Sequence, residues 1–239
     1  MTVLLTLCAY LGATVSGFVG MAGGVLLLVL MVLLGLDLMV AIPVHAVVQV
    51  AANASRLFAH AGNVKPRAVL YFTLAAIPGP VLGLWLVDRV DADRIKFLLG
   101  VVTLIAAWMP RRGIQVLGER TAFALGGMLG GVLGVVVGAV GPLIAPFLLG
   151  RGYDRYQMIA THAACSTLLH LVKIVAFGTI DFGYGEYIVW MAPMSAAVVA
   201  GTYTGKWLLG RLDERQFLLV YKSVLTLLAL RLCAFGLIG

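Results

Sequence analysis

The sequence predicts an all-α polytopic membrane protein made of two inverted repeats, and two observations support this fold class. Of the 239 residues, 62% are hydrophobic and 11% are charged, whereas soluble domains have about 45–50% apolar and about 25% charged residues. The chain also repeats itself at an offset of 117 residues, the separation between Asp37 and Asp154. At the same offset His45 matches His162 and Arg56 corresponds to Lys173. Because the chain has only four histidines, these coincidences indicate a duplication.

Each half is predicted to open with a helical hairpin whose tip is rich in glycine. Residues 1–36 contain no charged residue, and one straight helix of this length would measure about 54 Å, against a hydrocarbon core of about 30 Å. Glycine has a low helix propensity and a permissive backbone, so we expect a broken or re-entrant helix in each hairpin. The interrupting residues are Gly17, Gly20, Gly23 and Gly24 in residues 1–36, and Gly134, Gly138, Gly141 and Pro142 in residues 121–150.

Three conventional transmembrane helices are predicted to follow each hairpin. In the first half we expect them at 40–62, 68–87 and 95–109, and in the second half at 157–178, 187–209 and 217–238. This pattern divides the chain into a first transmembrane repeat at 1–110, a cytoplasmic linker at 111–120 and a second transmembrane repeat at 121–239.

The distribution of cations predicts the orientation of the repeats. If each opening hairpin returns to its own side, nine Lys and Arg residues of the connections gather on one side and three on the other; if it crosses once, the charges are nearly balanced. The positive-inside rule then places both termini outside the cytoplasm and the two halves in opposite orientations. The net charge of +7 is spread over short connections, so it indicates this membrane topology and not a nucleic-acid partner.

Polar residues recur at helical spacing on the first predicted span after each hairpin. Such residues lie on one face of a helix, where they either line a site or make ordinary interhelical hydrogen bonds. A cation within a span costs about 2.5–3.5 kcal/mol, so it usually faces a cavity or a partner unless it snorkels to the surface. The two polar stripes are His45, Gln49, Asn53, Arg56 and His60, and His162, Ser166, His170 and Lys173.

This chemistry predicts a site for a small anion near the middle of the membrane. No Asp or Glu lies clearly within a predicted span, so we expect neither a metal ion nor another cofactor. A helix that begins near a glycine tip would direct free N–H groups at an anion, although glycines also serve close helix packing. The predicted substrate-binding residues are Gly20, Gly23, Gly24, Gln49, Asn53, Arg56, Gly138, Gly141, Ser166, His170 and Lys173; those predicted to couple proton movement are His45, His162 and His170.

With these motifs the chain resembles the TauE/SafE sulfite exporter family, also called the four-toluene sulfonate uptake permease family. The resemblance rests on Gly-Met-Ala-Gly-Gly at 20–24, Gly-Ala-Val-Gly-Pro at 138–142 followed by Pro146, and the two polar stripes. It implies transport of small organosulfur anions or sulfur oxyanions, such as sulfite or sulfoacetate, across the bacterial inner membrane. Ala22 and Val140 interrupt the usual triple-glycine tips, and the proline that often follows is missing near Val29; these departures concern the substrate more than the architecture.

The sequence therefore predicts a secondary transporter for a small sulfur-containing anion, embedded in the lipid bilayer and not an enzyme. Two alternatives stay open at this point. One is an intramembrane enzyme acting on an anionic lipid or phosphate, with Ser166 and His170 as a dyad, and the other is a passive anion channel. The anion, the direction of transport, the coupling ion and the oligomeric state do not follow from the sequence.

Overall fold

The described part of the protein is a bundle of helices. The computed structural model describes residues 1–19, 23–87, 89–108, 117–138, 141–148, 151–208 and 214–238, and these contain no strand. The first half contributes α1 (Thr2–Val19), α2 (Gly23–Leu33), α3 (Leu38–Ala59), η1 (Ala61–Asn63), α4 (Pro66–Ala76), α5 (Gly79–Val87) and α6 (Ala92–Trp108). The second half contributes α7 (Glu119–Val136), α8 (Gly141–Leu148), α9 (Arg155–Gly178), η2 (Tyr184–Tyr187), α10 (Ile188–Leu208) and α11 (Glu214–Ile238).

The duplicated sequence produces duplicated helix starts. Gly35 and Gly152 have positive φ angles of 86° and 71°, a conformation that glycine adopts without steric cost. Two residues later, Asp37 accepts a hydrogen bond from the Met39 backbone N–H at the start of α3. Asp154 forms a capping box with Gln157 at the start of α9, which satisfies free N–H groups of the first turn. The same turn and cap therefore begin both central helices.

Both halves open with two helices joined at a break. Helix α1 packs against α2, and α7 packs against α8. Gly138 lies at the second break with a positive φ of 75°. In the first half the corresponding tip lies at residues 20–22, outside the described residues, and Gly20 is therefore not placed. Residues 109–116, which include most of the predicted linker, also lie outside the described part.

The conventional span predicted at 68–87 is not a single continuous helix. Two helices, α4 and α5, occupy this range and meet at a bend of 44°. Pro78 and Pro80 flank Gly79 at the bend; a proline has no backbone N–H and its ring clashes with the preceding turn, so α4 ends here. Gly79 also lies close to Gly131 of α7, where a Cβ would meet backbone atoms.

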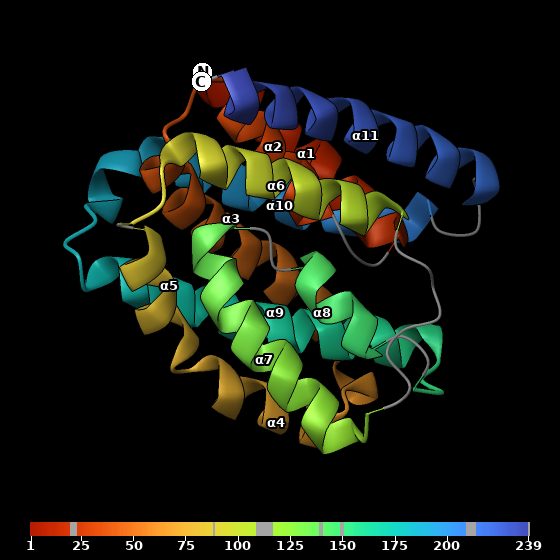
Figure 1. Cartoon of the computed structure of the whole chain (residues 1–239). Coiled ribbons are helices and arrows are strands. Elements are labelled where there is room, and N and C mark those ends of the chain that lie inside the picture. The colour runs from red at the N-terminus through yellow and green to blue at the C-terminus, as the bar shows by residue number, and fades with distance from the viewer. Residues whose placement is uncertain are drawn as a thin grey trace.

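Helices α3 and α9 lie in the middle of the bundle (Figure 1). The helices that surround them come from both halves of the chain. Helix α1 packs along α10, and its repeat equivalent α7 packs along α4 and α5. Helix α6 packs against its own equivalent, α11. The halves are thus interlocked, since the first helix of each half packs on the second span after the hairpin of the other half.

The two central helices run in opposite directions past each other. The His45 ring, in the first half of α3, contacts the His170 ring of α9 with centroids 5.7 Å apart. At the other end, His60 after α3 contacts Tyr156 at the beginning of α9, also at 5.7 Å. The polar stripes of α3 and α9 therefore face each other in antiparallel order.

The helices are apolar enough for a membrane protein. Three described helices are long and apolar enough to cross a membrane, namely Leu38–Ala59, Glu119–Val136 and Tyr156–Gly178, and the bent pair of α4 and α5 adds a fourth if it is one span. Large apolar side chains such as Val3, Phe58 and Val81 point outward, whereas polar groups such as Arg56 and Lys173 are buried. Apolar groups outside and polar groups inside suit a lipid environment.

Close packing of α7 on α4 depends on glycine, and this can be tested. A Cβ at Gly127 would clash with the backbone oxygen of Phe72. We expect Gly127→Ala to lower the free energy of unfolding by about 1–3 kcal/mol, the usual cost of overpacking, and hence to lower the Tm of the detergent-solubilised protein. Gly178→Ala is the matched control, because a Cβ there meets nothing within 4 Å. Equal Tm values for both variants would contradict this packing.

Candidate functional site

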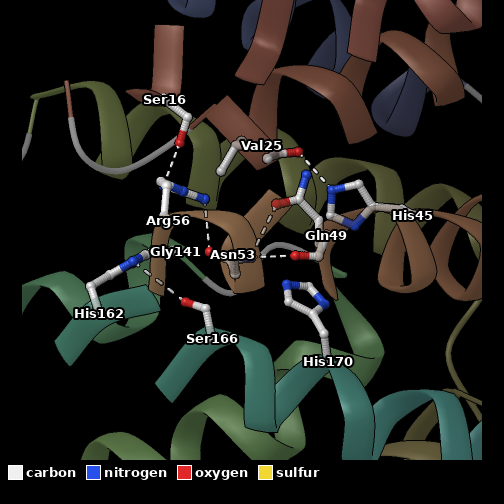
Figure 2. A pocket seen from close by; sticks show the side chains of 11 residues that line it. Ser16, Val25, His45, Gln49, Asn53, Arg56, Gly141, His162, Ser166 and His170 are labelled. Carbon is white, nitrogen blue, oxygen red and sulfur yellow. Dashed lines mark hydrogen bonds between the residues drawn. The ribbon is translucent and has the colours of Figure 1, made fainter. Parts of the chain in front are cut away.

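The polar stripes of α3 and α9 enclose a cavity together with the first turns of α2 and α8 (Figure 2). The space open to the centre of a water-sized sphere is about 20 Å³; one water needs about 10–15 Å³ on this measure. The cavity is therefore a narrow slot in this conformation. It is lined by Ser16, Gly24, Val25, His45, Gln49, Asn53, Arg56, Gly141, His162, Ser166 and His170.

A chain of hydrogen bonds runs along the α3 stripe. The Asn53 side-chain amide donates to the Gln49 backbone carbonyl at 2.7 Å and to the Gln49 side-chain oxygen at 3.4 Å. Arg56 Nη2 donates to Asn53 Oδ1 at 2.7 Å. The spacing of 4 and 3 residues that the sequence displays thus places three consecutive side chains in direct contact on one face of α3.

Arg56 is buried, with 5% of its surface exposed, and it does not snorkel. Besides Asn53, its Nη1 donates to Ser16 Oγ of α1 at 2.6 Å, which joins the central helix to the end of the opening helix. Sequence reasoning missed Ser16 and Val25. Ser16 had a recognisable signal, since it is a polar residue directly before Gly17 in a run without charged residues.

His45 and His162 play the same structural part in the two halves. His45 Nε2 lies 2.8 Å from the Gly24 carbonyl at the start of α2, and His162 Nε2 lies 3.4 Å from the Gly141 carbonyl at the start of α8. A carbonyl oxygen only accepts hydrogen bonds, so Nε2 carries the proton in both rings. Each histidine thus ties the helix that follows a glycine break to the central helix of its own half.

Ser166 contacts His162 and not His170, which is the partner that an enzymatic Ser–His dyad would require. Its Oγ lies 3.5 Å from His162 Nδ1, the nitrogen that accepts when Nε2 carries the proton. His170 instead lies against the His45 ring at an interplanar angle of 72°. In the described residues, no hydrogen bond joins Ser166 to His170.

Lys173 is buried behind the cavity, with 1% of its surface exposed. Its Nζ donates to the Gly138 carbonyl at 3.0 Å, next to the C-terminal end of α7, where a positive charge is stabilised by the helix dipole. Lys173, Gly138 and Gly23 are predicted site residues that do not line the cavity. Gly23 packs against α1, where a Cβ would meet the Gly12 oxygen. The two cations therefore occupy different environments despite their matched positions.

The charge of the cavity follows from its lining. Among the described residues that form it, Arg56 carries the one permanent charge and there is no Asp or Glu. Within the described part of the chain, no three His, Cys, Asp or Glu side chains gather where they would hold a metal ion. The described lining combines one guanidinium with neutral amide, hydroxyl and imidazole groups, a set that suits a small anion.

A comparison with protein families supports this chemistry. The model of the sulfite exporter TauE/SafE family matches residues 5–232, nearly the whole chain. Comparisons with curated proteins and with solved structures each found no match. The family match covers the glycine breaks, both central helices and every residue that lines the cavity. The chain therefore belongs to the sulfite exporter TauE/SafE family of membrane transporters.

Proposed function

We propose that the protein is a secondary transporter that moves a small sulfur-containing anion across the bacterial inner membrane by alternating access. The substrate class is sulfite, sulfoacetate or a related sulfonate. The observation that carries the proposal is the buried guanidinium of Arg56 in a cavity whose described lining has no carboxylate. Membership of a transporter family favours transport over the intramembrane enzyme.

The groups around Arg56 suit an anion that must be released again. A single guanidinium attracts negative charge strongly in a medium of low dielectric constant. Gln49, Asn53 and Ser166 offer neutral hydrogen bonds, and the first turns of α2 and α8 reach the cavity at Gly24 and Gly141. Neutral partners and helix N-termini bind an oxyanion less tightly than a second ion pair. The anion is therefore bound weakly enough to be released again.

We place this cavity at the interface of two inverted repeats. The antiparallel order of the equivalent helices α3 and α9 supports the inversion. So does the exchange of contacts by which α1 packs on α10 while α7 packs on α4 and α5. Secondary transporters with inverted repeats bind their substrates at the repeat interface, near the middle of the bilayer. The excess of Lys and Arg in the connections then assigns both termini to the periplasm.

Alternating access is proposed because the slot is too small for its cargo. About 20 Å³ is space for roughly one water, whereas sulfite has four heavy atoms. An anion can enter only if helices around the cavity move. Helices α2 and α8 are the elements that we expect to move, since each is short, follows a glycine break and contributes its first turn to the cavity.

Proton coupling through His45, His162 and His170 is part of the proposal. All three rings line the cavity, and histidine is the side chain whose charge changes most readily near neutral pH. A proton taken up beside the anion would neutralise its charge during transport. The coupling thus makes transport sensitive to a pH gradient.

The anion site is tested by flux into proteoliposomes with sulfite, thiosulfate, sulfoacetate and sulfate. We expect Arg56→Ala to lower sulfite flux by about tenfold to a hundredfold, because hydrogen bonds to a charged group contribute about 1.5–3 kcal/mol. Lys173→Ala should also lower flux, through the α7–α8 break that it holds. The matched control is Arg67→Gln at the exposed start of α4, which should retain the wild-type flux. Unchanged flux in both the Arg56 and Lys173 variants would remove the anion site.

Proton coupling is tested in a variant with His45, His162 and His170 all replaced by Gln. We expect its residual sulfite flux to respond little to an imposed pH gradient, because the titratable groups of the cavity are gone. Flux of the wild-type protein is measured with and without the gradient for comparison. A triple variant that keeps the full response would exclude these histidines as the coupling groups.

The inverted orientation is tested by labelling two equivalent connections. Gly62 follows α3 and Gly185 follows α9, and a side chain at either position would meet nothing within 4 Å. Single cysteines are introduced at each position after Cys8, Cys165 and Cys233 have been replaced by Ala. In intact cells we expect a membrane-impermeant maleimide to label Gly185→Cys and not Gly62→Cys. Labelling of both positions from the same side would contradict inverted repeats.

A further inference from the structure

We propose that the cavity selects anions that carry their own hydrogen-bond donor, a hydroxyl or N–H group, in addition to their anionic oxygens. This inference rests on the proposed transport function and narrows its substrate class. It follows from one nitrogen atom of His45 that has no partner and from the order of donors and acceptors along the cavity.

The hydrogen bond of His45 to α2 determines what its other nitrogen can do. Because Nε2 donates to the Gly24 carbonyl, the neutral ring has its lone pair on Nδ1, which is then an acceptor. His45 is 1% exposed and lines the cavity. Within the described part of the chain, its Nδ1 is buried without a hydrogen-bond partner. An unsatisfied acceptor thus lies beside the cavity.

His170 lies beside His45 and has a second buried nitrogen without a described partner. Its ring lies edge-on to the His45 ring at 5.7 Å, it is 3% exposed, and its Nδ1 also has no partner among the described residues. Protonation of His45 would turn Nδ1 into a donor, but it would add a second cation to a described lining that already holds Arg56 and has no carboxylate. The uncharged ring is therefore the form that first receives the anion, before any proton is taken up.

Arg56 and the unsatisfied His45 nitrogen belong to opposite sides of the slot. Figure 2 shows Arg56 and Ser16 at one side, His45 and His170 at the other, and Gln49 and Asn53 between them. An anionic oxygen only accepts hydrogen bonds, so it suits the Arg56 end and leaves His45 Nδ1 unsatisfied. Buried polar groups without partners are costly. An occupant that satisfies both ends has anionic oxygens at Arg56 and a donor at His45.

The size and charge of the occupant follow from the same geometry. The described lining contains one cation, so it matches an occupant with a single negative charge. Val25 adds an apolar wall, against which a short alkyl segment can lie. Hydroxyalkyl sulfonates and the singly protonated form of sulfite each combine a sulfur oxyanion, a single negative charge and a donor.

Isethionate and 1-propanesulfonate form a matched pair of probes. They have the same number of heavy atoms and the same charge, and they differ by a hydroxyl in place of a methyl group. In proteoliposomes we expect isethionate to compete with sulfite at a concentration at least about tenfold lower than 1-propanesulfonate, which is the effect of leaving one buried polar group unpaired. Equal competition by both probes would overturn the inference, because a resident water would then satisfy His45.

Replacement of His45 by Phe locates the effect. The variant His45→Phe keeps a ring of similar size and removes both nitrogens, so we expect the preference for isethionate to fall to within about twofold. His60→Phe is the control, since His60 contacts Tyr156 outside the cavity lining, and it should keep the wild-type preference. A preference that persists in His45→Phe would overturn the assignment to Nδ1.

The two proposals fail in different ways. If sulfite flux depends on Arg56 but the two probes compete equally, the proposed transport function is supported. The proposal that the cavity selects anions with a hydrogen-bond donor is then wrong. If neither probe competes and sulfite flux is the same with and without the protein, both proposals fall. The comparison of probes on the wild-type protein decides between these outcomes even if His45→Phe does not fold.

Discussion

The structure depends on burying two cations inside a helical bundle that faces lipid. Each cation within a membrane costs about 2.5–3.5 kcal/mol on insertion scales, and neither Arg56 nor Lys173 has a described carboxylate beside it. Neutral oxygens hold both instead. Arg56 donates to Ser16 and Asn53, and Lys173 donates to the carbonyl of Gly138. Because these oxygens belong to the opening hairpins or to the central helices, burial of the cations also joins those elements.

Both cations thus lie inside the bundle, and the described lining of the cavity has no carboxylate. Arg56 lies in the cavity, while Lys173 lies behind it and supports the break between α7 and α8. His45 and His162 tie the other side of each break to the central helices. His45 and His162 thus both hold the breaks and line the cavity. An anion that enters would bring its negative charge next to Arg56 and would contact both α2 and α8. Binding is thereby linked to the two helices that we expect to move.

Helical periodicity allowed the polar faces of α3 and α9 to be predicted from the sequence. Residues of the α3 and α9 stripes recur every three or four positions, so their common face and their meeting at one cavity followed from the sequence. The break after Ala76 was missed, because the apolar character of 68–87 outweighed the two prolines that end α4. Ser16 was missed within an apolar run. The partner of Lys173 is a backbone carbonyl, for which a sequence carries no signal, so its place behind the cavity needed the structure.

The central claim is that Arg56 holds an anion between α3 and α9. A structure determined experimentally with sulfite bound tests it most directly. We predict density for the anion in contact with the Arg56 guanidinium, between the first turns of α2 and α8, with the cavity wider than it is here. An anion bound elsewhere, or a guanidinium turned outward to the headgroups, would contradict this account.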